Sequence, residues 1–122
     1  MTNRYQQDLK ARAFKFSATL LQLYPKLAAG DRAHAHIGRQ LVEAGTSIGA
    51  MLEEAEVALS RRDMAAKQVV ALREARESNY WLRLLATEST WASAVAPLLD
   101  ESSQFVAMLT ASVRKLRARP SG

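Results

Sequence analysis

Apolar residues recur along this chain at steps of three and four, and this spacing constrains the fold more than any other feature of the sequence. Residues spaced in this way share one face of an α-helix, whereas a half-buried strand would alternate apolar and polar positions. In the first stretch the stripe comprises Leu9, Ala13, Phe16, Leu20 and Leu23. Helix-forming residue types are abundant from end to end, and no segment reads as a strand. The spacing therefore predicts an all-α chain of amphipathic helices.

Breaks in the spacing divide the chain into four predicted helices, at about residues 5–24, 32–59, 62–87 and 94–118. We expect Pro25 to end the first helix and Pro97 to lie in the first turn of the fourth, because proline lacks the amide hydrogen that a helix interior uses. Gly30 and Asp31 are typical of a helix stop followed by an N-cap. Ser60, three residues before an aspartate, has the spacing of a capping box.

Loops of a few residues join these long helices, the last of them at residues 88–90, and such loops make neighbouring helices antiparallel. The predicted fold is an antiparallel up-down-up-down four-helix bundle, formed by residues 1–122 as a single domain. The third helix carries apolar residues on two arcs, one around Val70 and Trp81 and the other around Leu72. We therefore expect this helix to be buried on two sides.

Basic residues outnumber acidic ones, and their placement suggests a binding surface. The chain has 17 Lys and Arg against 12 Asp and Glu, a net charge of +5. Four arginines fall in a narrow sector of the third helix, and the densest basic run spans residues 114–119, ending in Arg119. The candidate nucleic-acid contacts are Arg73, Arg76, Arg83, Arg114, Lys115 and Arg117. Such side chains contact phosphates, but they also pair with acids such as Glu77 or favour helix C-termini, and both interpretations stay open.

Polar residues beside the apolar stripes of the second and third helices suggest a structural polar network. Its candidate members are Gln40, Ser47, Glu54, Glu74 and Glu77. Glu77 lies on an apolar arc, and a carboxylate buried there has to find a cation or hydrogen-bond donors. A network that fixes helix register is favoured over a buried acid–base or metal site. His34 and His36 are two residues apart and point to different sides, so we expect no metal site and no cofactor.

Apolar residues away from the main stripes predict a subunit interface. Phe14 and Leu21 are seven residues apart on a displaced side of the first helix. Gly45 and Gly49 lie inside the second helix, where each costs about 1 kcal/mol relative to alanine. They indicate a close approach, by the ring of Trp81 or by a second subunit. We therefore expect copies of the chain to associate through these four positions.

Two segments of the chain resemble the signatures of a known family. Residues 40–55, QLVEAGTSIGAMLEEA, and residues 71–85, ALREARESNYWLRLL, resemble those of the four-helix-bundle family, also called the 23S ribosomal RNA intervening-sequence proteins. Residues 23–25, Leu-Tyr-Pro, match the family's end to the first helix, and the resemblance covers roughly residues 5–118. Two positions depart from the pattern, because Glu43 and Met51 stand where the family usually has Arg and Asn.

This resemblance implies an up-down-up-down bundle that often assembles as a homopentamer and has no known enzymatic activity. Some members of the family are encoded within intervening sequences of ribosomal RNA genes. Carried over by position, the polar signature residues are Gln40, Ser47, Glu54, Glu74 and Glu77.

The expected function is that of a non-enzymatic, homo-oligomeric interaction protein, a pentamer that binds RNA or DNA through its basic surface. The alternative is a protein-binding adaptor without nucleic-acid contact, in which the acidic second helix and the extra apolar stripes meet a partner protein. An enzyme using Glu54 and Glu77 is the weakest hypothesis, because no nucleophile or cofactor site accompanies them. The chain has no cysteine and no apolar run of the roughly 18 residues that a membrane span needs, so we expect a cytoplasmic protein.

Overall fold

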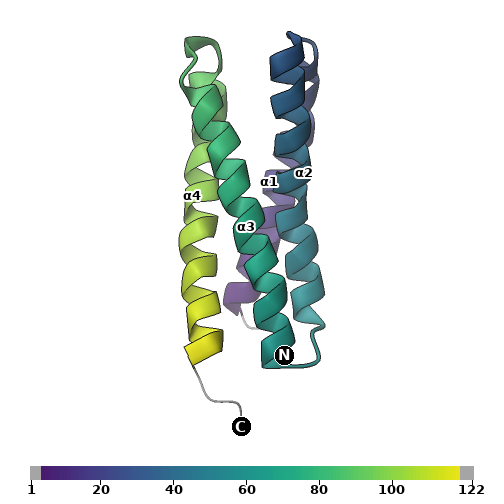
Figure 1. Ribbon diagram of the computed structural model, residues 1–122, viewed down its shortest axis with the longest axis vertical. Coiled ribbons are helices and arrows are strands. Elements are labelled where there is room, and N and C mark those ends of the chain that lie inside the picture. Colours follow the sequence, from purple (N-terminus) through teal and green to yellow (C-terminus); the bar gives the residue numbers. More distant parts are fainter. Residues whose placement is uncertain (1–3, 119–122) are drawn as a thin grey trace.

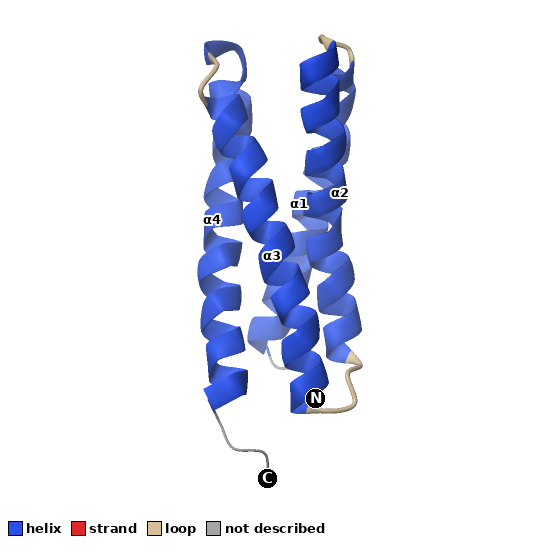
Figure 2. Cartoon of the chain, viewed as in Figure 1, coloured by secondary structure: helices blue, strands red, loops and turns tan. Residues whose placement is uncertain are grey.

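The computed structural model describes residues 4–118, and these form four helices that run alternately up and down (Figures 1 and 2). The helices are α1 (Arg4–Ala28), α2 (Arg32–Glu56), α3 (Arg61–Ala86) and α4 (Ser89–Ala118). No strand occurs among the described residues, so the prediction of an all-α four-helix bundle is confirmed. None of these four helices combines the length and the hydropathy that crossing a membrane requires.

Two prolines lie inside helices, contrary to the predicted helix ends. Helix α1 continues for three residues past Pro25, and α4 begins eight residues before Pro97. Both prolines are exposed, as are Leu21 and Ser93, the residues four positions before them. The carbonyl groups that lose an amide partner therefore lie on the solvent side, where water can bond them. Extending α1 past the proline also buries Leu27 and so removes its apolar surface from water.

Side-chain caps begin two of the helices as the sequence predicts. The carboxylate of Asp31 accepts a hydrogen bond from the amide of His34 at 2.8 Å, and the hydroxyl of Ser60 accepts one from the amide of Asp63 at 3.0 Å. Residues 88–90, expected as a loop, are helical from the second residue onward. The carbonyl of Glu88 already accepts amide hydrogen bonds from residues 91 and 92. Helix α2 ends three residues earlier than predicted, at residue 56.

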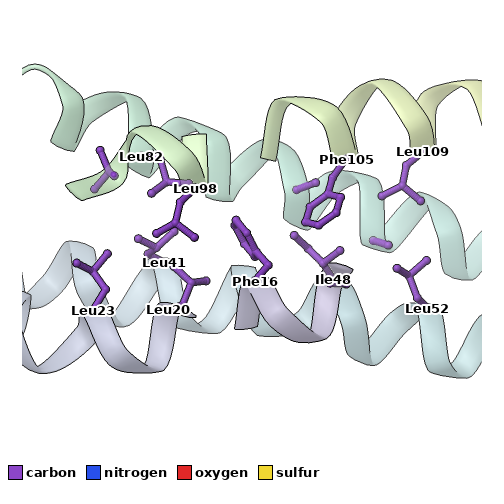
Figure 3. Close-up of a cluster of buried hydrophobic side chains, with 14 of the residues drawn as sticks. Phe16, Leu20, Leu23, Leu41, Ile48, Leu52, Leu82, Leu98, Phe105 and Leu109 are labelled. Carbon is purple, nitrogen blue, oxygen red and sulfur yellow. The ribbon is translucent and has the colours of Figure 1, made fainter. Parts of the chain in front are cut away.

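Buried apolar side chains from all four helices fill the centre of the bundle (Figure 3). The largest fully buried side chains of this core are Leu9, Leu20, Leu27, Leu41, Ile48, Leu82, Leu85, Val95, Phe105 and Leu109. The rings of Phe16 and Phe105 meet edge to face with centroids 5.3 Å apart. This contact joins the first helix to the last across the middle of the core.

Helices that follow one another in the chain pack closely, whereas α1 and α4 approach at few points. Long side chains close the seam between them. The Arg12 guanidinium donates to both carboxylate oxygens of Glu101 at 2.7 and 2.9 Å, and the Tyr5 hydroxyl donates to the carbonyl of Met108 at 3.1 Å. The α1–α4 seam is therefore held by side chains that span a wider gap, rather than by close helix packing.

The buried line of α3 draws on both predicted arcs only in part. Leu85 from one arc, and Ala75 and Leu82 from the other, are fully buried, together with Ala71 and Ser78. Val70, Trp81 and Leu72, around which the arcs were predicted, are only half-buried. The small side chains along this line let α2 and α4 approach closely on either side.

Gly45 and Gly49 pack against α1 of the same chain and not against Trp81, so that alternative is wrong, whereas their place in a subunit interface stays a prediction. A Cβ atom added to Gly45 would overlap the side chain of Leu20. One added to Gly49 would lie 3.5 Å from the Cβ of Ala13. The close approach that these glycines indicate is the packing of α2 on α1.

Candidate nucleic-acid interface

An open groove of about 510 Å³ runs between α3 and α4 on the outside of the bundle. Its lining residues are Arg76, Glu77, Asn79, Tyr80 and Arg83 from α3, with Ser103 and Val106 from α4. The groove thus brings two of the predicted phosphate contacts together with an aromatic ring. Residues 76, 80 and 83 follow one another at steps of four and three along α3, so their side chains share one face of this helix.

Asn79 is the centre of the hydrogen bonds in this groove, although it was not among the residues predicted from the sequence. Its side-chain amide nitrogen donates to the hydroxyls of Ser102 and Ser103 on α4, at 3.0 Å each. Its side-chain oxygen accepts a hydrogen bond from Nε of Arg83 at 3.0 Å. The serines therefore hold the amide, and the amide in turn orients the guanidinium. The spacing of four residues between Asn79 and Arg83 is a signal for this contact.

The guanidinium of Arg83 also lies over the ring of Tyr80, with its central carbon 5.7 Å from the ring centroid. The ring of Trp81 also meets that of Tyr80 edge to face, with centroids 5.2 Å apart. The indole nitrogen of Trp81 donates to the carboxylate of Glu77 at 3.1 Å. Tyr80 and Arg83 thus form an oriented cationic and aromatic pair at the surface.

Arg73 and Arg76 are exposed on α3 next to this pair. Arg76 lines the groove, whereas Arg73 lies near Glu74. Burial raises the pKa of the Glu74 carboxyl, the charge of Glu77 acts in the same direction, and Arg73 opposes both. Among residues 4–118 no salt bridge engages either arginine. Their guanidinium groups face solvent and can meet an anionic ligand.

The basic residues of α4 divide between two sides of the bundle. Arg114 is eight residues after Val106 and Arg117 is eleven, so both share the helix face that borders the groove. Lys115 is seven residues after Met108, which contacts α1, so it lies on the opposite side of α4. All three are exposed, and Arg119 lies outside the described residues. We call Arg76, Arg83, Arg114 and Arg117 the cationic face.

The predicted polar network does not form as one connected cluster. Glu54 is paired with Lys67 at 3.2 Å at the surface, and the Ser47 hydroxyl donates to the carbonyl of Glu43 in its own helix. No side-chain hydrogen bond within the described range joins any two of the five predicted members. Glu77, expected to be buried, is exposed, because its arc of α3 faces outward beside Trp81. Gln40 is half-buried on α2.

His34 joins two loops at the end of the bundle opposite Arg4 and Ala118. Its Nδ1 lies 2.7 Å from the Asp31 carboxylate and its Nε2 lies 2.8 Å from the Glu88 carboxylate. The hydrogen bond to Asp31, followed by that to Glu88, raises the pKa of His34. His36 is exposed and meets Trp81 edge on. In the part of the chain that the structure describes, no three His, Cys, Asp or Glu side chains are grouped to hold a metal ion.

Phe14 and Leu21, the predicted interface residues of α1, are exposed at 76% and 59%. Both lie on the side of α1 opposite Arg12 and therefore away from the α1–α4 seam. An exposed phenylalanine and leucine two helical turns apart form an apolar pair without cover in the single chain.

A solved structure resembles this chain over nearly its whole length. It is a protein of unknown function from the S23 ribosomal protein family of Bacteroides thetaiotaomicron VPI-5482. The two sequences are 31% identical, the alignment covers 89% of this chain and 97% of the other, and the TM-score is 0.78. No family model matches the chain, and no curated protein matches it either.

Proposed function

Since this chain belongs to the S23 ribosomal protein family, we propose that it is a non-enzymatic, homo-oligomeric four-helix-bundle protein that binds RNA or DNA in the cytoplasm. The observation that carries the proposal is the groove between α3 and α4, where Arg76 and Arg83 flank an exposed aromatic ring. Arginine recognises phosphate through paired N–H groups in a planar fork. The family name, which is that of a ribosomal protein, agrees with an RNA ligand.

The cationic face extends the groove along the bundle, which suits a long polyanion. Arg76 and Arg83 are separated by about 10 Å along α3, at 1.5 Å per residue. Arg114 and Arg117 continue the positive charge along α4. A ligand that neutralises four of its phosphates on these residues releases counterions, so the logarithm of its affinity falls with that of salt concentration with a slope of about −3.

Association of copies is supported by Phe14 and Leu21, the exposed apolar pair on α1. Burying these side chains in a second subunit would remove apolar surface from water. The resemblance to the four-helix-bundle family supports a pentamer. The other name of that family, the intervening-sequence proteins, suggests that the gene lies within a ribosomal RNA gene. Light scattering checks the subunit count, with Phe14→Glu and Leu21→Glu expected to give monomers. A wild-type monomer in dilute solution would overturn this part of the proposal.

The nucleic-acid part is tested by titrating a structured RNA and a DNA duplex across a salt series. We expect the double variant Arg76→Gln/Arg83→Gln to make the salt slope shallower by about 1.5 to 2. Arg39→Gln, together with Arg32→Gln, removes the same charge from exposed positions of α2 and is the matched control. Absence of binding at low salt, or an affinity that does not change with salt, would refute the proposal.

The protein-binding adaptor is the second candidate, and the same exposed pair on α1 favours it. Glu43 and Glu54 are exposed on the acidic second helix and would attract the positive surface of a partner protein. A protein captured in a pull-down that nuclease does not release, combined with no binding to nucleic acid, would favour the adaptor.

A further inference from the structure

The ring of Tyr80 is placed to receive a flat ligand. It is 48% exposed in the groove between α3 and α4, although most large apolar side chains of the chain are buried. Trp81 meets it edge to face, and Glu77 holds the indole nitrogen of Trp81. The aromatic ring is therefore fixed from one side while part of its surface remains open. Nucleic-acid bases stack on rings of this kind whatever their sequence.

Arg83 places a second planar group above the ring and is fixed in orientation. Its Nε is bonded to the Asn79 side chain, and its guanidinium lies over Tyr80. Within residues 4–118, its two terminal nitrogens have no hydrogen-bond partner. A guanidinium held through Nε keeps the face turned away from Tyr80 for a base, and it keeps its terminal N–H groups for a phosphate.

The exposed ring of Tyr80 in the groove favours a strand whose bases are unstacked. A duplex presents phosphates and groove edges, and its base faces are hidden in the stack. Stacking on Tyr80 requires a base that has left such a stack or was never in one. The groove volume of about 510 Å³ is within the range of sites that bind small molecules, so it can take a nucleotide. Val106 supplies an apolar contact on the α4 side.

We propose that this groove binds single-stranded nucleic acid, with one base stacked on Tyr80 and Arg83 while Arg83 and Arg76 hold neighbouring phosphates. This inference rests on the proposed function and names the form of nucleic acid that the site selects. Asn79 is a positioning residue in this arrangement, because it sets the direction of the Arg83 guanidinium and need not touch the ligand.

Fluorescence anisotropy with three labelled 12-mers tests the inference: an oligo(U) RNA, an unstructured DNA strand and a DNA duplex. Wild type is expected to bind both single strands more tightly than the duplex. Tyr80→Ala should weaken single-strand binding about tenfold and leave duplex binding unchanged within about twofold. Tyr80→Phe keeps the ring and should keep the affinity. Arg39→Gln is the control, and far-UV circular dichroism checks that each variant is folded.

The Asn79→Ala variant separates positioning from charge. It should weaken single-strand binding while leaving the salt slope unchanged, because Arg83 loses its orientation but keeps its charge. Arg83→Gln should both weaken binding and reduce the slope. If Asn79 were only structural, Asn79→Ala would lower the thermal midpoint without affecting the affinity of the folded protein.

The outcomes distinguish this inference from the proposed function. Equal loss of single-strand and duplex binding in Tyr80→Ala, or tighter binding of the duplex by wild type, would overturn single-strand selection. In that case the arginine variants would still weaken both ligands, and the proposed function would stand. Heparin, added at the same total charge, is expected to compete less well than oligo(U). Equal competition by the two would also overturn single-strand selection, because the site would then recognise charge alone. No binding of any strand would refute the proposed function itself.

Discussion

The same substitution, glycine to alanine, is expected to have opposite effects at two positions one turn apart in α2. Alanine favours a helix interior over glycine by about 1 kcal/mol, so both variants gain this amount. At Gly49 the new Cβ lies 3.5 Å from the Cβ of Ala13, an ordinary contact distance. We therefore expect Gly49→Ala to stabilise the bundle by about 0.5–1 kcal/mol.

At Gly45 the new methyl group has no room. It would overlap the side chain of Leu20 and lie 3.2 Å from Cε2 of Phe16. Leu20 is 1% exposed and is enclosed by the core, so it moves only by displacing its neighbours. Overpacking of this kind costs about 1–3 kcal/mol, which exceeds the helix gain. The net expectation for Gly45→Ala is a loss of about 1 kcal/mol, with a range of about 0 to 2.

Urea and thermal unfolding, followed by far-UV circular dichroism at one protein concentration, measure both changes. For a chain of this length 1 kcal/mol corresponds to a shift of about 4 °C in the midpoint. Gly49→Ala should therefore unfold about 2–4 °C above wild type and Gly45→Ala about 4 °C below it. A Gly45→Ala variant more stable than wild type, or equal shifts in the two variants, would refute the close packing of α2 on α1 at Gly45.

Three further changes test the ends and the seams of the bundle by thermal unfolding. His34→Gln should lower the thermal midpoint near about pH 5.5 and have little effect near about pH 8.5. The raised pKa of His34 gives a stabilisation that is complete below the pKa of the unfolded state and fades as pH rises through the pKa of the folded state. An equal loss at both pH values would contradict this. Glu101→Gln should cost about 0.5–1 kcal/mol, since its pair with Arg12 is partly exposed, and a neutral result would show that the α1–α4 seam does not depend on it. Phe105→Ala should cost about 3–5 kcal/mol through the cavity left beside Phe16, whereas a loss below about 1 kcal/mol would mean that the core collapses around it.

The helices could be predicted because their apolar stripes follow from local spacing, but the two ends next to prolines could not. Whether Pro25 or Pro97 interrupts a helix depends on which side of the helix loses its hydrogen bond. That side is known only once the helix has been packed against its neighbours. Both prolines lie on the solvent side, so the helices continue through them.

The cationic part of the candidate site could be predicted, whereas its hydrogen bonds could not. Arg76 and Arg83 share a helix face by spacing alone. The contacts of Asn79 with Ser102 and Ser103 depend on the register between α3 and α4, which no local pattern specifies. The exposure of Glu77 also depends on helix packing. An apolar arc of α3 can lie at the edge of the contact with a neighbouring helix and still face solvent.

The seam between α1 and α4 also bears on how the chain reaches its native state. Arg12 and Glu101, which bridge this seam, are 89 positions apart in the sequence. Every other seam joins consecutive helices across a short turn, where the entropy lost in bringing the partners together is small. Helical hairpins are therefore expected to form early and rapidly, and closure of the first helix onto the last is expected at the end of folding. Transient opening of the native bundle is expected to begin along the same line, since separating α1 from α4 breaks side-chain bridges and leaves the close helix pairs intact.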